Sequence, residues 1–146
     1  VDHFLALTLS LLKDQVDEVR TACCAIVPQI AAVSDPVWAH EAIFPSVKSM
    51  ANGEYLVRLS FISALEGFLR LDTLSEKFHS EVLSLLITCA GDKVPNIRIR
   101  VAQAMNAAMV EPHAEPFKDK LQGSLNELMK DTHRDVKYFA GKAAKE

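Results

Sequence analysis

The sequence lacks the residue patterns from which catalytic and metal sites are usually built. The five histidines are His3, His40, His79, His113 and His133, and they form no His-x-x-x-His pair. No Cys-x-x-Cys pair occurs either, so the ligand spacing of a zinc site is missing. The isolated glycines at Gly53 and Gly91 offer no phosphate-cradling loop. We therefore expect a protein that is not an enzyme and that binds no metal and no cofactor.

Net positive charge and long apolar runs are also missing. The chain has 16 Lys and Arg against 19 Asp and Glu, a net charge of −3, so no basic surface is expected for nucleic acid. No run of about 18 apolar residues indicates a membrane span, and no signal peptide is visible at the N-terminus.

The three cysteines, Cys23, Cys24 and Cys89, lie in apolar stretches. This pattern indicates buried, reduced thiols in a cytoplasmic or nuclear protein.

What the sequence does contain is one pattern that occurs four times in 146 residues. An apolar run ends in Asp or Asn, and a polar loop, an aliphatic residue, a base and a second apolar run follow. The bases are Arg20, Arg58, Arg98 and Lys137, separated by 38, 40 and 39 residues. Six residues before them stand Asp14, Asn52, Asp92 and Asp131. A period near 40 residues made of helical pairs is typical of a helical solenoid, which binds partners along a surface.

These copies predict an all-α fold of four helix-turn-helix repeats, a right-handed α-α superhelix in one array. The repeats are predicted at about residues 1–33, 34–71, 72–110 and 111–146. Their first helices are predicted at 4–13, 39–51, 76–90 and 117–130, and their second helices at 18–33, 56–71, 96–110 and 135–144. In the second helices, apolar residues recur at i, i+4, i+7 and i+8 from Val19, Val57, Ile97 and Val136. We expect this face, including Ile26, Ala143 and Ala144, to form the core.

Several residues mark where helices should begin, bend or end. The predicted start signals are Asp35 with Pro36, Ser75, Pro95, and a capping-box spacing from Thr132 to Asp135. Pro28 and Pro45 lie inside predicted helices and should bend them. The link around residues 111–116 is expected to be a solvated loop.

The spacing of six residues places each acid in a turn and each base one turn into the second helix. An acid just before a helix accepts its unpaired N–H groups, and the base can reach the acid or the turn of the adjacent copy. We expect an internal ladder that fixes the register of the repeats. The alternative is that this line of charges meets a partner. Asn52 interrupts the line of acidic residues, so the ladder should be weaker at that position.

The turns within the four pairs are expected to emerge on one edge, as a docking ridge. Tyr55, Leu56, Val94 and Pro95 are apolar at positions where solvent would favour polar residues. Apolar and aromatic side chains beside charges are typical of binding hot spots. The alternative is that Tyr55 and Val94 fold over the neighbouring turns.

The first predicted helix has apolar residues at Leu5, Leu9, Leu11 and Leu12, and no polar cap precedes it. The chain also begins without Met, inside this apolar segment. We expect a piece of a longer protein, with an apolar end that an upstream repeat covers or through which the chain self-associates.

Three stretches of the sequence resemble a known family. Residues 90–98 match the pattern A-G-D-x-V-x-N-[VI]-R, residues 135–140 read D-V-K-Y-F-A, and residues 38–45 match W-A-H-x-x-I-x-P. The chain resembles HEAT-repeat proteins. From about residue 11 to residue 144 it is similar to the C-terminal repeats of the A-type scaffold (regulatory) subunit of protein phosphatase type 2A.

This resemblance implies a non-catalytic scaffold that binds the catalytic subunit of a type 2A-like serine/threonine phosphatase through its intra-repeat turns. Regulatory subunits would bind upstream repeats that this chain lacks. The implied partner-binding residues are Tyr55, Leu56, Val94, Pro95, Asn96, Thr132, His133 and Arg134. The turn at residues 52–54 departs from the family's G-D-P-N-type turn, so a related phosphatase is an open alternative.

Two further alternatives belong to other functional classes. The first is an importin-like HEAT-repeat transport receptor or another protein–protein adaptor. It ranks lower because the second helices mix Arg98 and Arg100 with Glu66, whereas such receptors usually carry an acidic inner face. The second is an enzyme, which no constellation of residues supports.

Overall fold

The computed structural model describes residues 2–142, and this part of the chain consists of helices, turns and bends without a strand. The first helices of the pairs form one layer: α1 (Asp2–Ser10) with the 3-10 helix η1 (Leu11–Lys13), α3 (Pro36–Ala42) with α4 (Phe44–Lys48) and η2 (Ser49–Asn52), α6 (Glu76–Cys89), and α8 (Lys118–Leu128). The second helices form the other layer: α2 (Asp17–Ala32), α5 (Tyr55–Leu69), α7 (Pro95–Met109) and α9 (Arg134–Ala140). The 3-10 helix η3 (Pro112–Phe117) lies in the last link between pairs.

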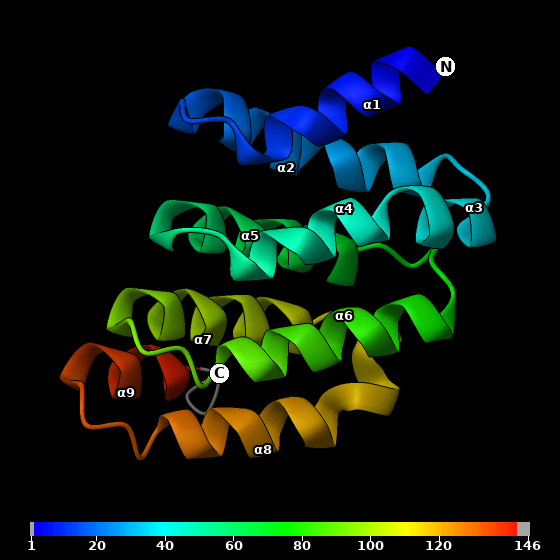
Figure 1. Cartoon of the computed structure of the whole chain (residues 1–146). Coiled ribbons are helices and arrows are strands. Elements are labelled where there is room, and N and C mark those ends of the chain that lie inside the picture. The colour runs from blue at the N-terminus through cyan, green and yellow to red at the C-terminus, as the bar shows by residue number, and fades with distance from the viewer. Residues whose placement is uncertain (1, 143–146) are drawn as a thin grey trace.

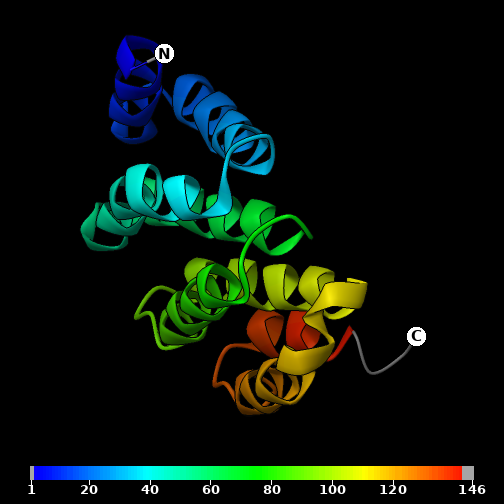
Figure 2. The same cartoon turned by 90° about the vertical axis from the view of Figure 1, so that its right-hand side faces the viewer.

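The helix pairs stack in chain order, from α1 and α2 at one end to α8 and α9 at the other (Figure 1). The view turned by 90° shows the two layers side by side (Figure 2). In the second layer, each helix packs against the next, α2 on α5, α5 on α7 and α7 on α9. The predicted all-α helical-repeat solenoid is therefore confirmed. The right-handed superhelix and the repeat limits at residues 33, 71 and 110 stay predictions.

The predicted face of the second helices supplies much of the core. Its members Val27, Phe61, Leu65, Val101 and Met105 are fully buried. The prediction was wrong at Ile26, whose side chain is 41% exposed. The equivalent Ala64 and Ala104 are buried in pairs that have a neighbour on both sides, whereas the first pair has a neighbour on one side only. The predicted core residues Ala143 and Ala144 lie outside the described residues.

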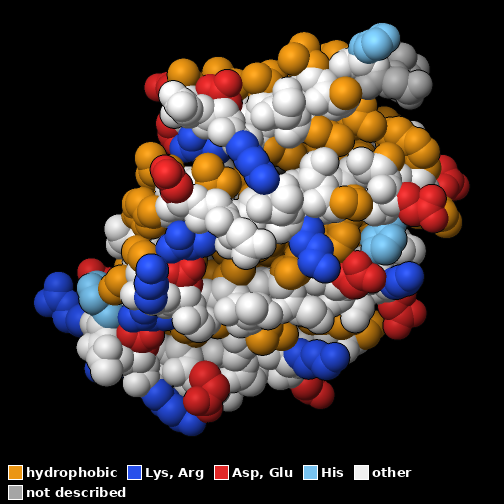
Figure 3. Space-filling view, in the orientation of Figure 1, with side chains coloured by type: hydrophobic (Ala, Val, Ile, Leu, Met, Phe, Trp, Pro, Cys, Tyr) orange, Lys and Arg blue, Asp and Glu red, His pale blue; other side chains and the backbone are white. Residues whose placement is uncertain are grey.

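An apolar surface lies on the first helix pair, but not at the residues from which it was predicted, because Leu5, Leu9 and Leu11 are half-buried against the core. Phe4 and Leu7 of α1 are exposed, while the more deeply placed Leu12 is buried. Figure 3 shows apolar side chains over this end of the stack. Its cover by an upstream repeat stays a prediction. Within residues 2–142, no helix combines the length and the apolarity needed to cross a membrane.

Two of the predicted helix starts carry the expected side-chain caps. The Asp35 carboxylate accepts hydrogen bonds from the N–H groups of Val37 and Trp38, both at 3.0 Å. The Ser75 hydroxyl accepts one from the Phe78 N–H at 3.2 Å. These caps fix the starts of α3 and α6, because each satisfies N–H groups that the helix itself leaves unpaired.

The capping box predicted from Thr132 to Asp135 was wrong. Helix α9 has His133 as its N-cap residue, and this residue makes no side-chain cap. Asp131 shapes the turn instead, by accepting a hydrogen bond from the His133 N–H at 2.8 Å. The short Asp135 side chain is a poor substitute for the Glu or Gln of a capping box.

The segment predicted as one helix over residues 39–51 is broken at Ile43. Pro45 has no N–H to donate to the carbonyl of Glu41, and its ring crowds that carbonyl, so the helix restarts at Phe44. Pro28, in contrast, lies inside α2 without interrupting it. The predicted loop at residues 111–116 was also wrong, since most of it forms η3.

Phe78 of α6 is the centre of an aromatic cluster that joins the second and third pairs. Its fully buried ring lies 5.1 Å from the rings of Phe44 and Phe68 and 5.4 Å from that of His40, measured between centroids. The cluster thus contains residues of α3, α4, α5 and α6, and it packs the second repeat against the third.

Two histidine side chains hydrogen-bond backbone carbonyls at the C-terminal end of α5. The Nε2 of His79 donates to the Leu71 carbonyl at 2.6 Å, and the Nε2 of His113 donates to the Leu69 carbonyl at 2.5 Å. The two rings stack at 5.1 Å. Both carbonyls are thus satisfied by side chains, and His79 is buried while it does so.

Stability is expected to fall as the pH decreases from about 7 to about 5. Burial lowers the pKa of His79, and His113 acts in the same direction, while the Leu71 and Phe68 carbonyls and Asp72 oppose the shift. The unfolded chain therefore takes up a proton near pH 6.5 that the folded chain resists, so the stability present above this pH is lost as the pH falls. Urea unfolding at several pH values measures the slope.

The variant His79→Gln keeps an N–H donor but does not titrate, so its pH slope in this window should be smaller than that of the wild type. His3→Gln, on the exposed side of α1, is the matched control and should leave the slope unchanged. Equal slopes for the wild type and His79→Gln would contradict the assignment.

Candidate protein-binding ridge

The turns that join the two layers all lie on one edge of the stack, at the left of Figure 1. They are residues 14–16, 53–54, 90–94 and 129–133, between the first and second helix of each pair. We call these turns, with the first residues of the helices that follow, the turn ridge. The links between pairs lie on the opposite edge. Loops held on a rigid scaffold are where binding residues are usually found.

An aspartate shapes three of the four turns. The Oδ1 atoms of Asp14, Asp92 and Asp131 accept the backbone N–H two residues further on, at 2.8, 2.9 and 2.8 Å. Each carboxylate thereby replaces a backbone turn bond. The second turn has Asn52 at this position, and no such bond occurs there within residues 2–142.

Two arginines connect consecutive turns through paired hydrogen bonds, which we call rungs. Arg58 binds Asp92, with Nε at 2.9 Å from Oδ2 and Nη2 at 3.3 Å from Oδ1. Arg98 binds Asp131 in the same way, at 2.7 and 3.1 Å. Such two-bond forks fix both the distance and the orientation of the partners.

Each of these arginines also holds the turn of its own pair. The Nη1 of Arg98 donates to the Asp92 carbonyl at 2.8 Å, and the Nη1 of Arg58 donates to the Gly53 carbonyl at 3.2 Å. One guanidinium therefore ties its own turn to the next one.

The rungs keep their carboxylates ionised. The hydrogen bond from Arg98 lowers the pKa of Asp131, against the opposing effect of burial. At Asp92, burial alone raises the pKa, but the hydrogen bonds from Arg58 and the Val94 N–H outweigh it, so the net pKa is below the ordinary value. Both acids therefore carry full negative charge at neutral pH.

The predicted ladder is incomplete at both ends of the array. Arg20 is only 2% exposed, and it donates to the Ser60 hydroxyl at 2.9 Å, to the Asp14 carbonyl at 2.7 Å and to the Asp17 carboxylate at 2.7 Å. Arg20 does not contact Asn52, whose amide side chain carries no charge and so cannot form an ion pair. At the other end, Lys137 is exposed and has no ion-pair partner in the described part of the chain.

The predicted partner-binding residues divide into an exposed and a half-buried set. Leu56, Asn96, Thr132 and Arg134 are exposed, whereas Tyr55, Val94, Pro95 and His133 are half-buried. Tyr55 and Val94 pack against the core, which was the alternative interpretation, and the Tyr55 hydroxyl accepts a hydrogen bond from Asn96 at 3.0 Å. Val16, which is not among the predicted contacts, is exposed on the first turn. Val16 stands two residues after Asp14, just as Val94 stands two residues after Asp92. This equivalence in the repeat pattern was the sequence signal that marked Val16 as a candidate contact.

The surface of the ridge mixes charge and apolar area. Figure 3 shows acidic and basic side chains alternating along this edge, with apolar side chains between them. Leu56 is 51% exposed and is the largest exposed apolar side chain among the predicted contacts. This composition fits a protein partner.

The cysteines are poorly suited to act as nucleophiles. Burial raises the pKa of Cys24 to about 12 and that of Cys89 to about 11. Both thiols therefore stay protonated at neutral pH, and the thiolate is the reactive form. Within the described ranges, no group of three or more His, Cys, Asp or Glu is placed to hold a metal ion.

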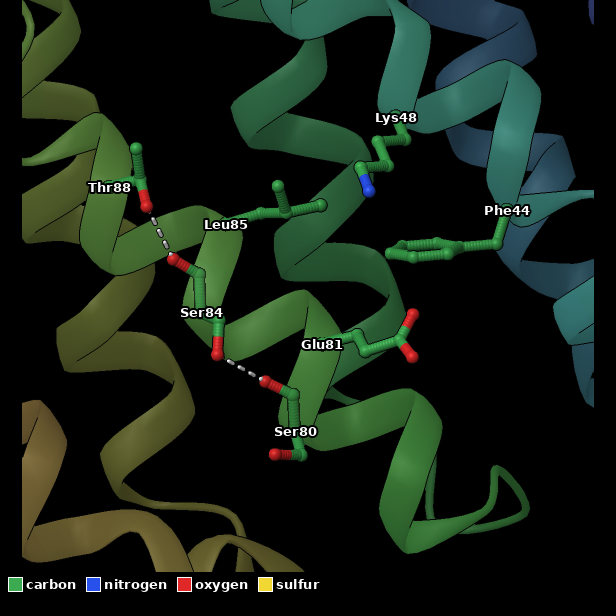
Figure 4. Close-up of a pocket in the computed structure, with 7 residues that line it drawn as sticks. All are labelled: Phe44, Lys48, Ser80, Glu81, Ser84, Leu85 and Thr88. Atoms are coloured by element: carbon green, nitrogen blue, oxygen red, sulfur yellow. Dashed lines mark hydrogen bonds between the residues drawn. The ribbon is translucent and has the colours of Figure 1, made fainter.

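A hollow of about 300 Å³ lies between α4 and α6 and is lined by Phe44, Lys48, Ser80, Glu81, Ser84, Leu85 and Thr88 (Figure 4). The Ser84 and Thr88 hydroxyls donate to carbonyls one turn earlier in α6, both at 2.9 Å. Glu81 pairs with His40 at 2.9 Å. Among the residues that line this hollow, no serine or threonine is hydrogen-bonded to a basic side chain.

The fold and the turn ridge define a helical-repeat solenoid whose turns lie along one edge. No model of a known protein family matches the sequence. The chain is 24% identical, over 150 aligned residues, to serine/threonine-protein phosphatase 4 regulatory subunit 1 of Homo sapiens, an alignment that covers 95% of this chain and 16% of that protein. The proteins of the same name from Rattus norvegicus and Mus musculus are 24% and 23% identical, with the same coverage.

These relatives are named as a regulatory subunit and not as a catalytic one. The similarity is therefore to a phosphatase regulator in general and is not specific to the A-type scaffold of type 2A. The chain spans 16% of the length of these relatives, so it corresponds to one segment of them.

Proposed function

We propose that this chain is a non-catalytic scaffold segment that binds the catalytic subunit of a type 2A-like serine/threonine protein phosphatase through its turn ridge. The observation that carries the proposal is the alignment of four turns on one edge, with three of them linked by the rungs from Arg58 and Arg98. The relatives supply the class of partner, because their name ties them to phosphatase 4. We favour the type 4 enzyme over type 2A itself on this ground.

In this function the segment positions the phosphatase and takes no part in the chemical reaction. A scaffold that holds the enzyme near a substrate raises the local concentration of one around the other. The cytoplasm or the nucleus is the proposed compartment. Contacts with other regulatory subunits are proposed for repeats outside this chain.

Leu56→Asp is expected to weaken binding of the phosphatase 4 catalytic subunit by about tenfold, which corresponds to ~1.4 kcal/mol. Leu56 is the better probe because it is exposed, whereas Tyr55 and Val94 pack against the core, and changes there would disturb the fold as well as the surface. Biolayer interferometry with the purified catalytic subunit measures the affinity, and circular dichroism checks that the variant is folded.

Val33→Asp is the matched control, since Val33 is 88% exposed and lies in a link between pairs, on the edge opposite the ridge. It should leave the affinity unchanged. Equal affinities for Leu56→Asp and Val33→Asp would reject the ridge as the binding surface. Type 2A and type 1 catalytic subunits, measured in parallel, test the choice of phosphatase.

A further inference from the structure

The face of the second layer that points away from the first is bridged by side chains at one step and open at another. Between α5 and α7, the Nη2 of Arg100 donates to the Ser63 hydroxyl at 3.3 Å and to the Glu66 carboxylate at 2.5 Å. Counted from the repeated bases, the residues that correspond to Ser63 and Glu66 one repeat earlier are Ala25 and Pro28. Neither has a polar side-chain atom, so this bridge has no counterpart between α2 and α5.

A groove of about 450 Å³ lies between α2 and α5 at this open step. We call it the α2–α5 groove. A Cβ atom at Gly67 would lie only 2.8 Å from the Cγ of Pro28, so α5 approaches α2 closely there and no side chain fills the groove. The volume falls within the range of about 300–1,000 Å³ that is typical of ligand pockets. The residues of its lining that the proposal uses are Thr21, Ala25, Pro28, Gly67 and Arg70.

Arg70 is the one residue in the lining of the groove that is charged at neutral pH, since burial raises the pKa of the Cys24 thiol to about 12. The Arg70 side chain is 55% exposed, and its Nη2 lies 2.9 Å from Oε1 of Glu66. Glu66 also pairs with Arg100 through Oε2, at 2.5 Å, so two arginines share one carboxylate and positive charge is left over. A guanidinium presents a fork of N–H donors, so Arg70 can bind a second carboxylate while it keeps Glu66.

We propose that the α2–α5 groove receives a short acidic segment of a third protein. An aliphatic side chain of this segment packs against Ala25, Pro28 and Gly67, and a neighbouring Asp or Glu pairs with Arg70. The exposed Thr21 hydroxyl is placed to hydrogen-bond the backbone of the segment. A basic segment is disfavoured, because it would meet Arg70 with like charge.

This inference goes beyond the proposed function, because the groove lies on the face of the second layer and the turn ridge lies along an edge. Together, the two surfaces let the scaffold hold a phosphatase on the ridge and a second protein in the groove. The experiments on the groove use peptides, so their outcome does not depend on the catalytic subunit.

The probe is acetyl-glutamyl-leucyl-glutamyl amide, which places an acid on either side of the leucine. At millimolar concentration it is expected to shift the NMR amide signals of Ala25, Gly67 and Arg70 in the wild type. Acetyl-lysyl-leucyl-lysyl amide should shift none of them, and acetyl-glutamyl-glycyl-glutamyl amide, which has no aliphatic side chain, should bind more weakly. The proposal is overturned if the acidic leucine peptide leaves these three amides unmoved, or if the basic peptide shifts them equally.

Two variants test the contacts separately. Arg70→Gln removes the charge but keeps a donor, and the affinity for the acidic peptide should fall about three- to fivefold; Arg134→Gln, 94% exposed on the ridge, is its control. Ala25→Leu puts a larger side chain into the groove from an exposed position and should abolish binding, whereas Ala22→Leu, exposed on the same helix outside the lining, should not. Circular dichroism checks that each variant is folded. Equal affinities within either pair of variants contradict the assignment.

Binding of the phosphatase 4 catalytic subunit separates this inference from the proposed function. Arg70→Gln and Ala25→Leu should bind it as the wild type does, because the ridge is unchanged. A loss of this binding in either variant would make the catalytic subunit the occupant of the groove and would overturn the assignment to a third protein. If the catalytic subunit does not bind the wild type, the proposed function is rejected, and the peptide measurements alone decide the groove.

Discussion

Phe78→Ala is expected to lower the free energy of unfolding by about 3–5 kcal/mol. The ring is fully buried and touches three other aromatic rings, so its removal loses apolar burial and leaves a cavity between the second and third pairs. Urea unfolding followed by circular dichroism measures the change.

The same variant should also change the form of the transition. In a solenoid, each pair contacts only its neighbours, so a weakened interface separates the array into two units. We expect the unfolding curve of Phe78→Ala to broaden or to split into two steps. Phe4→Ala, on the exposed face of α1, is the matched control and should cost less than about 0.5 kcal/mol. A single transition as sharp as that of the wild type would show that this cluster does not couple the repeats.

Arg98→Ala is expected to lower the free energy of unfolding by about 2–4 kcal/mol, because removal of one member of a buried ion pair leaves the other unpaired. The side chains of Arg98 and Asp131 are 15% and 11% exposed. The substitution removes the fork to Asp131 and the bond to the Asp92 carbonyl, so two turns lose their connection. Without Arg98, the pKa of Asp131 should rise towards its ordinary value, which NMR titration measures.

Arg134→Ala is the matched control for this change, since its side chain is 94% exposed and its pair with Asp135 is long, at 3.6 Å. An exposed pair of this kind contributes less than about 1 kcal/mol. If Arg98→Ala and Arg134→Ala destabilised the chain equally, the rung would have no structural role. Asp131→Asn alone and combined with Arg98→Ala completes the double-mutant cycle that isolates the pair.

The sequence was sufficient to predict the elements and their stacking. All four second helices begin one residue before the predicted start, because the apolar spacing and start signals such as Pro95 coincide there. The break at Ile43 was anticipated only as a bend. Whether a helix bends or stops at a proline depends on whether tertiary contacts outweigh the lost hydrogen bond, and the sequence does not contain those contacts.

The orientation of the ridge residues could not be predicted. Tyr55, Leu56, Val94 and Val16 all read as apolar residues in or beside a turn, yet two pack inward and two are exposed. Val16 and Val94 are both N-cap residues with nearly the same backbone conformation, so what surrounds each side chain decides its burial, and the local sequence does not contain that information. The positions of His79 and His113 were missed for a related reason, since backbone carbonyls at the end of α5 hold them. Any residue type supplies such an acceptor, so the sequence carries no signal for it.

The rungs have a consequence for the spacing of the last three turns. Asp92 accepts Arg58 at its carboxylate and Arg98 at its carbonyl, so an unbroken line of hydrogen bonds runs from Gly53 to Asp131. Distances along this edge are therefore set by short polar contacts and not by the size of the apolar side chains behind them. Substitutions that conserve volume in the interior can therefore accumulate while these turns keep their separation. A partner that contacts several turns at once then meets the same spacing of contact points.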